Sequence, residues 1–166
     1  MIVLLGLELA TGNFAVIPIA VKDGQTRIER LFRNWFWVLV GNLIGGVGYA
    51  LLFTTVITKF GHADPTSLDQ VVKLVALAEQ KTIAYAAIGF GGVVTAFVSA
   101  VLYDRMVALG SVIAFTSTAT GGKIAAMWLP TVIFFALGYE HAIVNMFVIP
   151  AGMMLGANIT MLEWWT

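Results

Sequence analysis

Side chains that could carry chemistry are scarce within the apolar stretches of this sequence. His141 is the one whose charge changes most easily near neutral pH. A histidine in an apolar span is costly unless it is hydrogen-bonded or faces a polar cavity. Such a group could assist the protonation of a weak-acid anion, which crosses an apolar constriction more easily when neutral because a bare ion is expensive to desolvate. A purely structural hydrogen-bonding role for His141 is the alternative.

The other candidates for proton chemistry inside these stretches are three carboxylates, Glu8, Asp104 and Glu140. His62 lies too far from His141 in sequence to suggest a metal-ligand pair, and no metal site is predicted. The absence of cysteine excludes thiol catalysis, disulfides and thiolate metal sites. No nucleophile motif or phosphate-binding loop accompanies the carboxylates. We therefore expect neither an enzyme nor a bound cofactor.

The elements that must position these residues are membrane helices. Hydrophobic residues make up 60% of the chain and charged residues 11%, against roughly 25% charged residues in a soluble domain. The net charge is zero, and no basic cluster suggests nucleic-acid binding. The composition predicts an all-α integral membrane protein whose main partner is membrane lipid.

Apolar stretches that are long enough, or nearly so, to cross a bilayer in about 20 helical residues occupy residues 1–21, 35–57, 86–115 and 124–157. The first and last are interrupted by polar residues. The segment between the first two spans carries four of the nine basic residues, which predicts a cytoplasmic loop, so that residues 58–82 form an outer loop. We expect one multi-pass domain over residues 1–166 in a cell membrane, a bacterial inner membrane by default.

An internal repeat links the two interrupted spans. A shift of 132 positions aligns GLELATGNFAVIPIA, from Gly6, with GYEHAIVNMFVIPAG, from Gly138, and seven of the fifteen positions are identical. The matches pair Glu8 with Glu140 and Asn13 with Asn145. Duplicated halves whose broken helices meet near the bilayer midplane are a recurring plan of transport proteins. Two kinked helices with buried polar residues are the structural alternative.

The repeat also predicts missing parts. The first copy is followed by a helix containing Gly41, Gly45 and Gly46, which should permit close helix contact. The matching element of the second half would begin beyond Thr166. We expect that about one and a half helices are absent before Met1 and one after Thr166, and that a complete protein has six.

The motifs ELATGN from Glu8, NW from Asn34, GNL from Gly41 and GYEHAIVNMFVIP from Gly138 resemble the formate/nitrite transporter family. The resemblance implies an aquaporin-like inverted repeat, six helices per protomer with two of them broken, a homopentamer, and a pore through each protomer. The function it implies is transport of small monovalent weak-acid anions, formate or nitrite. A pore for small neutral solutes is the alternative, although paired Asn-Pro-Ala motifs are absent from this sequence.

By the same resemblance, His141 is the central pore histidine and Thr11 gates or hydrogen-bonds at the first broken helix. Constriction residues would be Leu9, Val107 and Phe134, for which apolar packing is the alternative. Support of the breaks is expected from Glu8, Asn13, Glu140 and Asn145.

This sequence departs from the family pattern at two positions. Counting back from Gly122-Lys123, the asparagine that the family uses to bond the central histidine corresponds to Asp104. An aspartate there could favour a cationic histidine and another solute preference, or simply pair with Arg105. The family's outer lysine registers with Ile88, so that Lys81 is only an approximate substitute.

Overall fold

The computed structural model describes residues 8–65, 68–137 and 141–165, and all regular elements within these ranges are helices. The chain divides into two compact units. The first unit comprises Met1–Asn42 with Ser99–Tyr139, and the second comprises Leu43–Val98 with Glu140–Thr166. The described residues of the first repeat copy lie in the first unit, and those of the second copy lie in the second unit.

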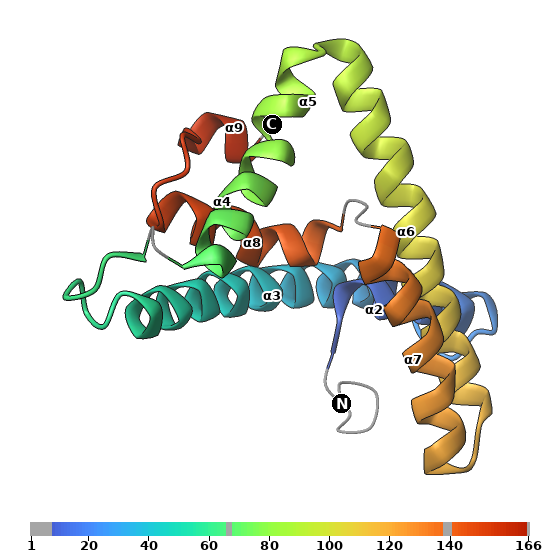
Figure 1. Ribbon diagram of the computed structural model, residues 1–166. Coiled ribbons are helices and arrows are strands. Elements are labelled where there is room, and N and C mark those ends of the chain that lie inside the picture. Colours follow the sequence, from blue (N-terminus) through green and yellow to red (C-terminus); the bar gives the residue numbers. More distant parts are fainter. Residues whose placement is uncertain (1–7, 66–67, 138–140, 166) are drawn as a thin grey trace. The chain divides into compact units, whose positions relative to one another are not determined.

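The helices, in chain order, are α2 (Ala10–Lys22), α3 (Ile28–Ile57), α4 (Asp69–Gln80), α5 (Ile83–Ala87), α6 (Phe90–Thr116), α7 (Thr120–Leu137), α8 (Ala142–Met154) and α9 (Met161–Trp165) (Figure 1). Helix α3 begins before the predicted span 35–57 because the charged residues ahead of Trp35, such as Arg30 and Arg33, are good helix formers. At 1.5 Å per residue, α3 is about 45 Å long, which exceeds the hydrocarbon core of a bilayer.

Helix α4 lies in the segment that the sequence analysis treats as an outer loop. Its apolar residues Val71, Leu74, Val75 and Ala78 follow the i, i+3, i+4, i+7 pattern of an amphipathic helix. The helix is too short to span a membrane, so that a search by span length misses it. This pattern was the available signal.

Two of the described helices, α3 and α6, are long and apolar enough to cross a membrane, and α8 is a shorter apolar helix. Large apolar side chains on α3 and α6 are widely exposed, including Leu52 (66%), Val56 (75%) and Phe97 (68%). Apolar surface of this extent suits a lipid environment.

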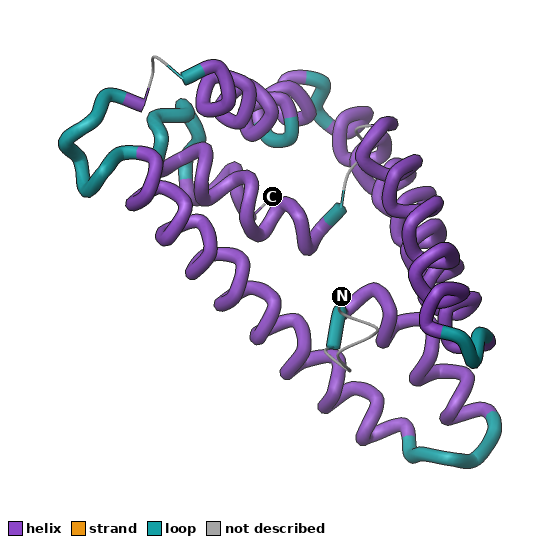
Figure 2. Tube along the Cα trace, turned by 60° about the horizontal axis from the view of Figure 1, so that its bottom comes forward, coloured by secondary structure: helices purple, strands orange, loops and turns teal. Residues whose placement is uncertain are grey.

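In the first unit, α2 lies beside the first half of α3, and α6 and α7 run side by side (Figures 1 and 2). A Cβ added to Gly110 of α6 would lie 3.2 Å from Cγ of Pro130 on α7. The absence of a side chain at Gly110 therefore lets these two helices approach closely.

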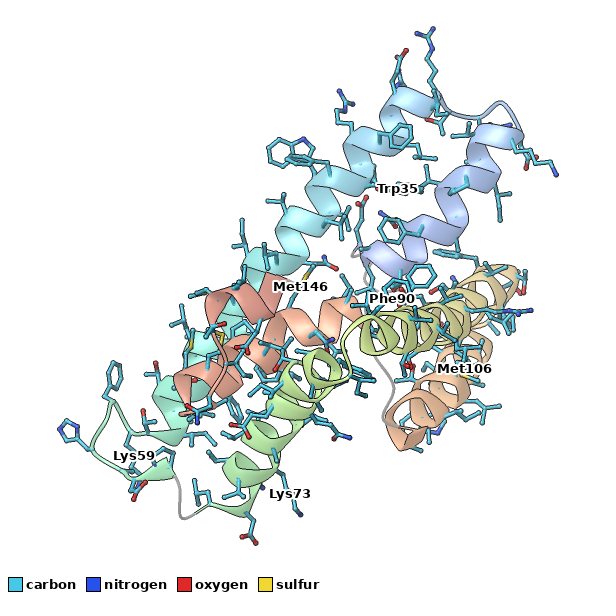
Figure 3. The ribbon with its side chains drawn as sticks, turned by 90° about the horizontal axis from the view of Figure 1, so that it is seen from above. Trp35, Lys59, Lys73, Phe90, Met106 and Met146 are labelled. Carbon is cyan, nitrogen blue, oxygen red and sulfur yellow. The ribbon has the colours of Figure 1, made fainter. Side chains whose placement is uncertain are left out.

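In the second unit, α8 packs against α4 and against the second half of α3. A Cβ added to Gly46 would lie 2.9 Å from the carbonyl oxygen of Met146, which Figure 3 labels where α8 meets α3. The prediction of close helix contact is confirmed at Gly46, whereas the described residues leave open space around Gly41 and Gly45. On the other side of α8, Gly152 faces Ala78 of α4.

Candidate functional site: the two helix breaks

The first break, residues 8–13, places an extended residue directly before α2. Leu9 is the N-cap, with φ −116° and ψ 130°, and its side chain offers no hydrogen bond to the helix. An acceptor comes instead from α3, because the Ala10 N–H donates to Oδ1 of Asn42 at 3.4 Å. The first turn of α2 is therefore capped from a neighbouring helix.

A triangle of hydrogen bonds joins the two ends of the first break to α3. The Asn13 side chain donates to Oε2 of Glu8 (3.0 Å) and to Oδ1 of Asn34 (2.8 Å), and the Asn34 side chain donates to the same Glu8 oxygen (2.9 Å). The Asn13 amide thus bonds two side chains that flank the break. Trp35 packs edge-on against Phe14 of α2, with ring centroids 4.8 Å apart (Figure 3).

Thr11 lies in the first turn of α2 and is only 3% exposed. Its buried hydroxyl oxygen has no hydrogen-bond partner among the described residues. Because a buried hydroxyl without a partner is costly, Thr11 is a site at which a solute atom could complete the hydrogen bonding.

The second break, residues 140–145, starts α8 with a different cap. His141 is extended, with φ −139° and ψ 117°, and its Nδ1 accepts the Ile143 N–H at 3.0 Å. The side chain is buried, with 4% exposed. When Nδ1 is an acceptor, the proton of a neutral ring sits on Nε2. In this state Nε2 is a hydrogen-bond donor.

The sequence repeat is reproduced in local structure. Ala10–Lys22 and Ala142–Met154 are both helices of 13 residues, and the shift of 132 positions superposes their first and last residues. The N-cap of each, Leu9 or His141, accepts from the amide four residues later, at 3.0 Å in the first copy and 2.9 Å in the second. Leu9 and His141 are therefore equivalent positions that carry different chemistry.

The two helices also end in the same way, which the sequence comparison misses. Gly24 and Gly156, again 132 positions apart, have positive φ values of 72° and 101°. The amide that follows each glycine donates back to a carbonyl five residues earlier, Gln25 to Ala20 and Ala157 to Gly152. This is the glycine-terminated turn that commonly ends a helix. The aligned stretch of fifteen residues stops short of this glycine pair.

The other predicted residues are distributed between the units. Asp104 and Val107 lie on α6 in the first unit, both partly buried. Phe134 lies on α7, but its side chain is outside the described ones, and Glu140 is outside the described residues altogether. Asn145 lies in the first turn of α8 in the second unit.

Ser111 is a buried polar residue that the sequence analysis misses. It is 3% exposed, and its hydroxyl donates to the Val107 carbonyl at 3.0 Å. A Cβ added to Gly12 would lie 3.5 Å from the Ser111 oxygen, so that α6 touches the first turn of α2 here. The available signal was its spacing of four from Val107 and seven from Asp104, which places all three on one helix face. In the described part of the chain, no group of three or more acidic or histidine side chains could hold a metal ion.

Comparison with known proteins identifies relatives along the whole chain. The sequence model of the formate/nitrite transporter family matches residues 1–166. A probable formate transporter of Methanothermobacter thermautotrophicus is 35% identical over 163 residues, which cover 94% of this chain and 58% of the relative. The formate channel BtFdhC of Bacillus thuringiensis is 29% identical, with 94% and 55% covered. The formate channel FocA of Escherichia coli K12 is 27% identical, with 99% and 53% covered.

The chain spans about half the length of these curated relatives. No solved structure matches it. The family is one of membrane transporters and not of enzymes, and the resemblance carried by the motifs around Glu8 and His141 is confirmed. The chain therefore belongs to the formate/nitrite transporter family.

Proposed function

We propose that the complete protein transports small monovalent weak-acid anions, formate or nitrite, through a pore in each protomer. The observation that carries this proposal is the pair of equivalent helix starts. One has a buried hydroxyl at Thr11 that lacks a partner among the described residues, and the other has a buried imidazole at His141. Relatives that are named formate channels or formate transporters support the choice of solute.

The N-terminus of a helix attracts anions, because the first amides carry partial positive charge. Both α2 and α8 begin inside apolar segments, where this partial charge is weakly screened. A monovalent anion at such a site gains favourable electrostatics from the helix N-terminus. The Thr11 hydroxyl would donate to an oxygen of this anion.

His141 then assists protonation of the anion. With Nδ1 accepting the Ile143 N–H, the neutral ring donates from Nε2 to the solute. A second proton can enter the ring only at Nδ1, so that the imidazolium form must give up the bond to Ile143. From this imidazolium form, transfer of the Nε2 proton to formate or nitrite yields the neutral acid and leaves a neutral ring that is protonated at Nδ1. The neutral acid crosses an apolar constriction at a far smaller desolvation cost. We propose Leu9, Val107 and Phe134 as the apolar constrictions.

The architecture proposed for the complete protein follows the family resemblance. It has six helices with an inverted repeat, is multi-pass in a cell membrane, and assembles as a homopentamer. Asp104, at the position of the family's asparagine, is proposed to modify solute preference.

The deciding experiment is flux into liposomes that contain the complete protein, with formate, nitrite and glycerol compared from about pH 5 to about pH 8, the range in which histidine titrates. Anion flux that rises with acidity, without glycerol flux, is the expected result. Glycerol flux without anion flux would contradict the proposal and favour a pore for small neutral solutes. Anion flux without any dependence on pH would contradict the role assigned to His141.

A further inference from the structure

Two asparagines of α3 contact the first break from one side. Asn34, Val38 and Asn42 are spaced four residues apart and so share a helix face. Asn34 bonds Glu8 and Asn13, and Asn42 bonds the amide of Ala10. The side chains of Glu8 and Asn13 and the backbone amide of Ala10 are thus bonded to a single stripe of α3.

The two asparagines supply what the break itself lacks. Leu9 has no side-chain acceptor, so that the Ala10 amide depends on Asn42 for an acceptor other than water. The Glu8 carboxylate accepts one amide N–H from Asn34 and one from Asn13. Hydrogen bonds to a charged acceptor are stronger than neutral ones, and this triangle fixes the distance between the extended residues and α2.

We propose that Asn34 and Asn42 are positioning residues that set the location of the Thr11 hydroxyl. Thr11 lies between Ala10, whose N–H donates to Asn42, and Asn13, whose side chain donates to Asn34. Thr11 is therefore flanked on both sides by residues that are hydrogen-bonded to α3. This inference rests on the proposed function of Thr11 as a solute contact. The second break has no need of such an outside cap, since His141 caps α8 itself.

The triangle allows a reciprocal exchange of chemistry. In Asn34→Asp, a carboxylate replaces the amide that donates to Glu8, so that two like charges face each other. In the double variant Glu8→Gln with Asn34→Asp, the amide and the carboxylate change places, and the network regains one charge with the same number of donors. Asn158→Asp is the matched control, because the Asn158 side chain is exposed and has no described bond to this network.

Two readouts are measured on the complete protein in liposomes: formate flux, and the labelling rate of a cysteine at Thr11→Cys with a small methanethiosulfonate reagent. Residues 1–166 contain no cysteine, and any cysteine elsewhere in the complete protein is replaced by serine before labelling. We expect Asn34→Asp to change both rates about tenfold, as for the loss of a charge-assisted hydrogen bond, and the double variant to restore both. Asn42→Leu should also change both rates, whereas Asn42→Asp, which keeps the acceptor, should preserve the labelling rate.

Failure of the double variant to restore the labelling rate, or equal effects of Asn34→Asp and Asn158→Asp, would overturn the proposal. The labelling rate does not depend on the identity of the solute. If the unmodified protein carries no formate but labelling follows the expected order, the proposed function fails while the positioning role stands. If formate flux is normal and labelling is unaffected by Asn34→Asp, the positioning role fails alone.

Discussion

The two helix breaks have the same backbone conformation but different N-caps. Helices α2 and α8 begin and end at equivalent residues, and each is followed by a glycine with positive φ. At the N-cap, however, α2 has Leu9 and relies on Asn42 of α3, whereas α8 has His141, which accepts the Ile143 amide itself. The same local fold is therefore started by a fixed neutral acceptor in one copy and by a titratable group in the other.

This difference shows how a duplicated element can divide its tasks. A cap borrowed from α3 leaves position 9 free to be an apolar residue, as a constriction requires. A cap supplied by the histidine ties the start of α8 to the protonation of the ring. Of the two N-cap residues, only His141 carries a titratable side chain.

The largest effect is expected at His141. In His141→Leu, both the cap and the imidazole are lost, so that the second break resembles the first. Anion flux should fall about 100-fold or more, as for loss of a proton-transfer group. Helix α8 should be destabilised by about 1 kcal/mol. In His141→Asn, a good N-cap replaces the ring, so that stability should be kept while flux and its pH dependence are lost. Flux from about pH 5 to about pH 8 and thermal unfolding separate the two effects. A pH profile that survives in His141→Asn would show that the imidazole acts only as a cap.

The packing of α8 on α3 should be the next most sensitive feature. Gly46→Ala would place a methyl group 2.9 Å from the Met146 carbonyl oxygen, which should cost about 1–3 kcal/mol of stability, as other overpacked sites do. Gly45→Ala is the control, because that position faces open space and alanine favours the helix by about 1 kcal/mol relative to glycine. Thermal unfolding in lipid nanodiscs measures both. Equal losses of stability for the two variants would contradict the close approach of α8 to Gly46.

At the first break, Thr11→Val tests the buried hydroxyl. Because this oxygen has no partner in the described structure, its removal should leave stability unchanged or raise it by about 1 kcal/mol, while anion flux falls about tenfold through loss of one hydrogen bond to the solute. Thr11→Ser, which keeps the hydroxyl, should retain flux. A marked loss of stability in Thr11→Val would show instead that the hydroxyl supports the fold.

The breaks can be located from the sequence because polar residues such as Glu8 and His141 interrupt apolar stretches that would otherwise be continuous. The pairing of Leu9 with His141 also follows from the ungapped repeat. The capping role of Asn42 could not be predicted, since it depends on a contact across 32 positions between α2 and α3. The triangle around Glu8 was hidden for the same reason: sequence spacing shows that Asn13 and Asn34 are polar but not that their amide groups meet.

The smallest effect of a substitution is expected after α8, where the two repeat copies differ again. Thr160 and Glu163 form a capping box at the start of α9. Oε2 of Glu163 accepts hydrogen bonds from the N–H (2.7 Å) and from the hydroxyl (2.8 Å) of Thr160. The equivalent positions in the first copy, 132 residues earlier, are Ile28 and Leu31, which cannot form such a box.

These hydrogen bonds from Thr160 lower the pKa of the Glu163 carboxyl. A lowered pKa in the folded state means that the box contributes to stability above the ordinary carboxyl pKa, and that this contribution is lost as pH falls through the lowered value. The protection of α9 amides, which is the ratio of the intrinsic exchange rate to the measured rate at the same pH, should therefore decrease as the pH falls. Glu163→Gln should abolish this additional response and leave exchange in α3 unaltered. The same additional response in Glu163→Gln would show that another group controls the start of α9, and the contrast between the two copies would then be confined to their N-caps.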